Sequence, residues 1–141
     1  MKKNWILIIF WALMAVFVYI LCQFFLPPVR DFVKGSELFL VPLAVFCLLG
    51  LALTILVFKA KESGRKNLFF LLTGFSSFGF FIFVFLHNAF YALAEISKNI
   101  VALNYLLEAL EVIFFITAVI ICPIVFLIGS IGAIVLFVKE R

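Results

Sequence analysis

Four long apolar stretches constrain this chain more than any other feature of its sequence. They cover Trp5–Leu26, Leu38–Phe58, Leu68–Ala94 and Val112–Val138. A hydrocarbon core ~30 Å thick is crossed by about 20 helical residues, and each stretch reaches that length. The sequence therefore predicts an all-α membrane protein, folded as a four-transmembrane-helix bundle in one domain over residues 1–141.

The composition supports the same class of protein. Hydrophobic residues make up 68% of the chain and its mean hydropathy is +1.38, whereas soluble domains are about 45–50% apolar. The 21 phenylalanines either line an aromatic ligand cavity or provide lipid-facing bulk, and bulk is the favoured interpretation. The net charge of +4 does not indicate nucleic-acid binding, because the basic residues border the apolar stretches instead of forming one patch.

The distribution of lysine and arginine predicts the topology. If the stretches cross the membrane alternately, eight of the 11 basic residues fall on one side: Lys2, Lys3, Lys59, Lys61, Arg65, Lys66, Lys139 and Arg141. The other side receives Arg30, Lys34 and Lys98. Because cytoplasmic loops carry the excess of basic residues, we expect a multi-pass protein of the plasma membrane with both termini in the cytoplasm.

The N-terminal stretch imitates a signal peptide, since Lys2 and Lys3 precede an apolar run. The run is longer than the about 7–15 residues of a signal h-region. We therefore expect a retained first span. Pro27 and Pro28 should end its helix, because proline lacks the amide donor and restricts the residue before it.

The three cysteines give no sign of a metal or cofactor site. Cys22, Cys47 and Cys122 lie within the apolar stretches, and no Cys-x-x-Cys pair or histidine tract accompanies them. Zinc sites need closely spaced Cys and His ligands. We expect no metal and no cofactor, and cysteines that pack as small apolar residues.

The segment Leu93–Leu110, between the third and fourth stretches, is amphipathic. Its apolar residues recur at steps of three and four: Leu93, Ile96, Ile100, Leu103, Leu107 and Leu110. This period predicts a helix with one apolar face. The helix either lies on the outer membrane surface over about residues 95–108 or extends the fourth span, and the surface helix is favoured.

Small residues predict where the helices pack, because lipid provides no hydrophobic force between them and close approach supplies the attraction. The expected packing residues are Cys47 and Gly50 on the second stretch, Gly74 and Ser77 on the third, and Ala118, Cys122, Gly129 and Gly132 on the fourth. Pro123 should bend the fourth helix near mid-membrane, because the carbonyl of Val119 loses its donor.

The one candidate site surrounds His87, the only histidine. Asn88 and Tyr91 flank it, and Gln23 and Glu111 lie at the same level of the predicted membrane. Together they could line an outward-facing polar pocket, with His87 and Glu111 as a ligand or proton site, since histidine titrates near neutral pH. The favoured interpretation is a structural clamp, in which His87 bonds one glutamate or carbonyl and joins two helices. Glu95 and Glu108 are the other possible partners.

Three short segments resemble small uncharacterised four-span membrane proteins of bacteria and archaea. They are Leu71–Ser77, Leu86–Tyr91 and Cys122–Gly129. The resemblance covers about half of the chain. It implies a multi-pass helical bundle and brings no activity, so no functional residue is carried over.

Three functions are compatible with these features. The favoured one is a non-enzymatic structural or interaction subunit, whose partners are the lipid bilayer and either further copies or a larger membrane complex. The small-residue faces of the second and fourth stretches and the outer amphipathic segment would be its contact surfaces. The alternative is a small transporter or channel component with a pocket around His87. The third is a membrane enzyme acting on a lipid or quinone.

Overall fold

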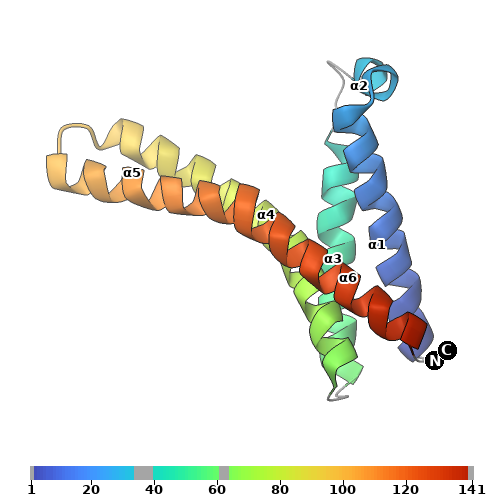
Figure 1. The fold of residues 1–141 in the computed structure, drawn as a ribbon. Coiled ribbons are helices and arrows are strands. Elements are labelled where there is room, and N and C mark those ends of the chain that lie inside the picture. The colour runs from blue at the N-terminus through green and yellow to red at the C-terminus, as the bar shows by residue number, and fades with distance from the viewer. Residues whose placement is uncertain (1, 34–39, 61–63, 140–141) are drawn as a thin grey trace.

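The computed structural model describes residues 2–33, 40–60 and 64–139, and every regular element in these ranges is helical (Figure 1). The elements are α1 (Lys2–Phe25), α2 (Pro27–Val33), α3 (Val41–Ala60), α4 (Arg65–Ile96), α5 (Val101–Ile116), the π-helix η2 (Thr117–Ile121) and α6 (Cys122–Lys139). Within these ranges, four helical stretches are long and apolar enough to cross a membrane. The prediction of an all-helical protein with four such stretches is confirmed.

The double proline ends α1 as predicted and also begins a helix that the sequence analysis missed. α1 stops at Phe25, and after Leu26 the chain enters α2 at Pro27. Proline suits the first positions of a helix, because its fixed φ is already helical and its missing N–H would have no partner there. The predicted start of the second span, Leu38, lies outside the described residues.

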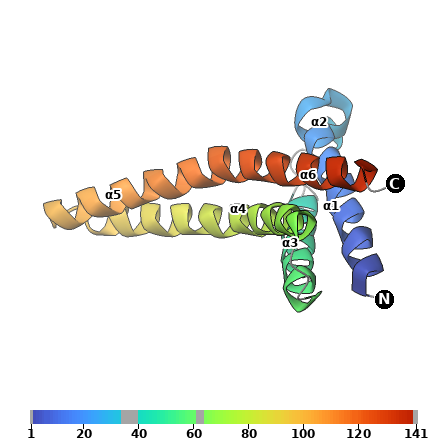
Figure 2. The same cartoon turned by 60° about the horizontal axis from the view of Figure 1, so that its bottom comes forward.

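α4 is the central helix of the fold. It packs against α3 on one side and against α6, η2 and α5 on the other, whereas α1 packs mainly against α3 and α2. Figures 1 and 2 show two helix pairs, α1 with α3 and α4 with α5–α6, which cross near the chain termini and diverge away from them. The helices thus meet at one end instead of running side by side throughout.

The outer amphipathic segment is not a separate surface helix, and this part of the prediction is wrong. α4 continues through Ile96, and the chain turns over Ser97–Ile100. α5 then begins at Val101 and continues through η2 into α6, a helical stretch of 39 residues. The sequence between Val101 and Cys122 contains neither Gly nor Pro, so nothing in it interrupts the helix. The alternative, an extension of the fourth span, is the arrangement found.

The expected distortion at Pro123 takes the form of a π-helical turn. The wider turn occupies Thr117–Ile121, immediately before the proline. Proline cannot donate to the carbonyl four residues earlier, and a π-turn is one way for a helix to accommodate the missing bond. At the start of this turn, the Thr117 hydroxyl donates a hydrogen bond to the Ile113 carbonyl at 2.8 Å. Figure 2 shows the arched course of α5 and α6.

Aromatic side chains join the two helix pairs where they cross. The ring of Phe10 on α1 lies 5.1 Å from that of Phe70 on α4. The ring of Phe126 on α6 lies 4.5 Å from Phe17 on α1 and 5.2 Å from Phe46 on α3. Such ring pairs contribute about 0.5–1.5 kcal/mol each beyond the area that they bury. The hydrophobic core therefore lies at the crossing.

Small residues allow α4 to approach both of its neighbours closely. A Cβ atom added at Gly74 would lie 2.4 Å from Thr54 Oγ1 and 2.9 Å from the Gly50 carbonyl oxygen on α3. One added at Gly129 on α6 would lie 2.7 Å from the Thr73 backbone nitrogen. The small-residue faces expected as free contact surfaces on the second and fourth spans are therefore occupied by α4.

The other expected packing residues are buried or half-buried. A Cβ atom added at Gly50 would collide with Ser77 on α4. A Cβ atom added at Gly132 would collide with the ring of Phe69, also on α4. Ala118 and Cys122 are buried, and Cys47 is half-buried. Gly79 on α4 lies beside Cys122, at a distance where an added Cβ would still fit.

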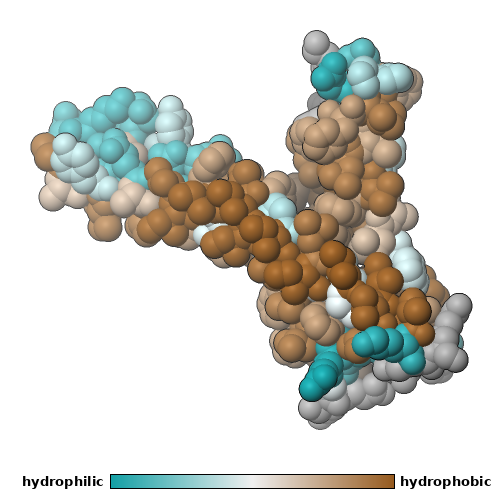
Figure 3. Space-filling view, in the orientation of Figure 1, coloured by the Kyte–Doolittle hydropathy of each residue, from teal (hydrophilic) through white to brown (hydrophobic). Residues whose placement is uncertain are grey.

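Polar residues gather at three ends of an otherwise apolar surface (Figure 3). The first, named here the basic end, carries exposed Lys59, Arg65 and Lys139 near both chain termini. The second is α2 and the third is the turn between α4 and α5. We name the outer part of the second helix pair, residues 80–96 of α4 together with α5, the arm.

Candidate functional site

His87 and Glu111, which the sequence suggested as a pair, lie together in the arm. Nδ1 of His87 on α4 is 3.4 Å from Oε1 of Glu111 on α5 and 3.4 Å from the Glu111 carbonyl oxygen. The two side chains are 26% and 20% exposed. The ring of Phe115 lies 5.2 Å from the imidazole. Half-burial against an aromatic ring limits the access of water to this contact.

The hairpin formed by α4 and α5 sets this geometry. Phe114 on α5 lies between two rings of α4, 6.1 Å from Phe83 and 5.1 Å from Phe90. These contacts fix the register of the two helices on either side of His87. The Glu111 carbonyl oxygen is a hydrogen-bond acceptor, so the contact with it forms in the tautomer that carries the proton on Nδ1. A neutral His87 would then donate a hydrogen bond, and a protonated one would form an ion pair.

The other predicted members of the site do not complete an enclosed pocket. Asn88 is exposed, and its amide donates to the Val84 carbonyl of its own helix at 2.8 Å. Tyr91 is 53% exposed. Gln23 is buried near the end of α1, in the helix pair that diverges from the arm in Figure 1. The structure brings together His87 and Glu111, and it does not bring Gln23 to them.

The remaining acidic residues considered as partners of His87 have other contacts. Glu95 binds Lys98, with 2.5 Å between Oε2 and Nζ, and this hydrogen bond raises the pKa of Lys98 above its ordinary value. Oε1 of Glu108 accepts a hydrogen bond from Asn104 at 2.7 Å. Both contacts are exposed and stabilise the tip of the arm only slightly.

Buried hydroxyl groups on the crossing helices are satisfied within their own helices. Each donates to the carbonyl four residues earlier, at 2.6–2.9 Å: Thr54, Thr73, Ser76, Ser77 and Ser130. Lipid offers no hydrogen-bond partner, so such bonds remove the penalty of placing a hydroxyl there. These side chains therefore serve packing. Among the described residues, no group of three His, Cys, Asp or Glu side chains is placed to hold a metal ion.

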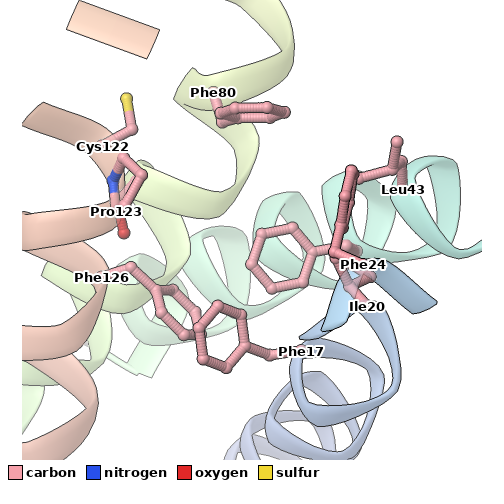
Figure 4. Close-up of a pocket in the computed structure, with 10 residues that line it drawn as sticks. Phe17, Ile20, Phe24, Leu43, Phe80, Cys122, Pro123 and Phe126 are labelled. Atoms are coloured by element: carbon pink, nitrogen blue, oxygen red, sulfur yellow. The ribbon is translucent and has the colours of Figure 1, made fainter. Parts of the chain in front are cut away.

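An apolar cavity of about 170 Å³ lies where the two helix pairs meet (Figure 4), although the sequence favoured lipid-facing bulk over an aromatic cavity. Its lining comes from all four membrane-length stretches and includes Phe17, Phe46, Phe80 and Phe126. The high phenylalanine content was the signal for such a cavity. It could not be located from the sequence, because many other phenylalanines face outward, as does Phe85.

The contact between His87 and Glu111 leads to a prediction about stability. We expect His87→Ala and Glu111→Gln each to lower the free energy of unfolding, with a coupling energy of about 0.6 kcal/mol and at most ~1.7 kcal/mol, the range of interhelical hydrogen bonds in membranes. A double-mutant cycle on the purified protein in detergent would measure the coupling. Asn88→Ala is the matched control on α4, because its amide stays within one helix. Strict additivity of the His87 and Glu111 variants would contradict the clamp.

Searches of protein families, of curated proteins and of solved structures found no match to this chain.

Proposed function

We propose that the protein is a non-enzymatic integral membrane protein that acts by contact with further copies of itself or with a larger membrane partner. The observation that carries this proposal is the arm. Its two helices extend beyond the crossing of the helix pairs, and apolar side chains project from both of them (Figures 1 and 3). An arm of two helices has much of its surface available for a neighbour in the bilayer.

The arm combines bulky and small groups in a way that suits helix packing. Phe85 is 70% exposed and Tyr105 is 69% exposed. Ala102 and Ala109 are exposed on α5, seven residues apart and therefore on nearly the same side of the helix. Small residues allow helices to approach, and large ones fill the space beside the contact.

Cross-linking would test this proposal. In a background with alanine at Cys22, Cys47 and Cys122, we expect Phe85→Cys to form a discrete adduct in native membranes with a bifunctional maleimide. Val41→Cys on α3 is the matched control, because Val41 is 52% exposed and lies at a similar distance along its helix from the basic end. Equal adducts from both variants, or monomer from Phe85→Cys, would contradict the proposed contact surface.

The proposed location is the plasma membrane, with both termini in the cytoplasm. The basic end would face the cytoplasm, while α2 and the turn between α4 and α5 would face outward, because basic residues are retained on the cytoplasmic side. In intact cells and in the cysteine-free background, a membrane-impermeant maleimide should label Asn99→Cys in that turn and should not label Lys66→Cys. The reverse pattern would overturn the orientation.

A second candidate function is a small transporter or channel component, and the contact between His87 and Glu111 favours it. Ionisable side chains within membrane spans often mark proton or substrate pathways in transporters. Proton flux into proteoliposomes distinguishes the candidates. Proton flux that is lost in His87→Ala, with unchanged thermal stability, would support the transport function. Absence of flux with the unmodified protein would exclude proton transport and favour the contact function.

A further inference from the structure

The cavity at the crossing is built from aromatic side chains of all four membrane-length stretches. Phe17 and Phe24 come from α1, Phe46 from α3, Phe80 from α4 and Phe126 from α6. Figure 4 shows the labelled rings placed around one space between the helix pairs. Its volume of about 170 Å³ resembles that of an engineered apolar cavity of ~150 Å³ that stays dry and binds benzene.

The lining excludes water as the occupant. Among the described residues that line the cavity, Ser76 provides the only hydroxyl group. That hydroxyl donates to carbonyls of its own helix, to Leu72 at 2.7 Å or Thr73 at 3.1 Å. A buried water needs two to four polar partners. An empty cavity would leave the rings without dispersion contacts on one side. The occupant that satisfies both conditions is a hydrocarbon.

The cavity lies near the middle of the bilayer. On each of the four helices, one lining residue is separated by 11 to 14 residues from a basic residue near the basic end. The pairs are Phe17 and Lys3, Phe46 and Lys59, Ser76 and Arg65, and Phe126 and Lys139. At ~1.5 Å per residue this is about 17–21 Å, an upper limit for an inclined helix. The midplane of a hydrocarbon core ~30 Å thick lies about 15 Å from its border. All four helices therefore place the cavity close to the midplane, where the acyl chains of the two leaflets end.

We propose that this cavity binds the terminal part of an acyl chain of a phospholipid. The helix pairs diverge from the crossing toward α2 and the tip of the arm (Figure 1), so a chain would enter from the leaflet at those ends. Exposed Arg30 on α2 lies at the same end of the first helix pair, with its Nε 3.8 Å from Oδ1 of Asp31, and its remaining N–H groups suit a lipid phosphate. The inference is independent of the proposed contact function, because none of the cavity residues named here except Phe80 belongs to the arm.

Photolabelling would test the proposal in vesicles of phosphatidylethanolamine and phosphatidylglycerol. A small fraction of the phosphatidylethanolamine would carry a diazirine either at the end of one acyl chain or beside the headgroup. Phe46 and Phe126 are only 7% and 2% exposed, so lipid outside the cavity contacts little of their surface. We expect the terminal diazirine to label them and the diazirine beside the headgroup to leave them unlabelled. Equal labelling by both probes, or no labelling by either, would overturn the proposal.

A variant that fills the cavity separates binding from background. Leu43→Trp places a larger side chain in the lining, and we expect it to abolish labelling of Phe126. Leu48→Trp is the matched control, on the exposed face of the same helix, and labelling should persist. If Leu43→Trp does not fold, Ile20→Phe replaces it, since Ile20 also lines the cavity. Labelling of Phe126 that persists in a folded variant with a filled cavity would overturn the proposal. So would competition in which a short-chain quinone reduces the labelling and unlabelled phospholipid does not.

Discussion

Alanine at position 74 should lower the thermal unfolding temperature in detergent much more than alanine at position 79. A Cβ at Gly74 would lie 2.9 Å from the Gly50 carbonyl oxygen and 3.1 Å from the Thr54 nitrogen, which are backbone atoms of α3. Backbone atoms cannot rotate away, so α3 and α4 must separate. Overpacking of this kind costs about 1–3 kcal/mol and occasionally more, and we expect the upper part of that range.

Gly79 is a closely matched control for this experiment. It lies on the same helix, and the nearest atoms to an added Cβ, in Phe83 and Cys122, are 3.7 and 3.8 Å away. Both substitutions gain the same helix propensity, about 1 kcal/mol for glycine to alanine, so the difference between them reports the close approach of the helices. Equal unfolding temperatures would show that α3 and α4 do not pack as described.

Phe126→Ala should be the most damaging single truncation in the aromatic core. Phe126 is 2% exposed, and its ring contacts those of Phe17 and Phe46 from the other helix pair. Truncation of a buried phenylalanine costs about 3–5 kcal/mol in soluble proteins. We expect a loss near 3 kcal/mol, because in lipid the unfolded chain is not exposed to water and only the packing contribution is lost.

Leu127→Ala provides the comparison, since Leu127 is 45% exposed on the same helix. Its truncation should change the free energy of unfolding by less than about 0.5 kcal/mol, as is usual for surface positions. Reversible unfolding in mixed micelles of detergent and dodecyl sulfate would measure both variants. Similar losses for the two would contradict the placement of the core at the crossing of the helix pairs.

The candidate site was only partly accessible to sequence reasoning. Glu111 was one of several acidic residues at the same predicted level as His87, and the structure distinguishes it from Glu95 and Glu108, which have other contacts. This choice depends on the register of α4 against α5. The register is set by ring contacts around Phe114, between residues too distant in sequence for their contact to be predicted.

The sequence by itself determined the helical class, the four membrane-length stretches and the end of α1 at the double proline, because hydropathy, length and the missing proline amide act locally. Only the tertiary structure decided that α4 is central, that α5 extends α6, and that the helix pairs diverge around a cavity. The reason is the solvent. In lipid, the buried and exposed faces of a helix are both apolar, so hydrophobic periodicity does not specify which faces meet. Close contacts, such as that of Gly74 with Gly50, make that choice.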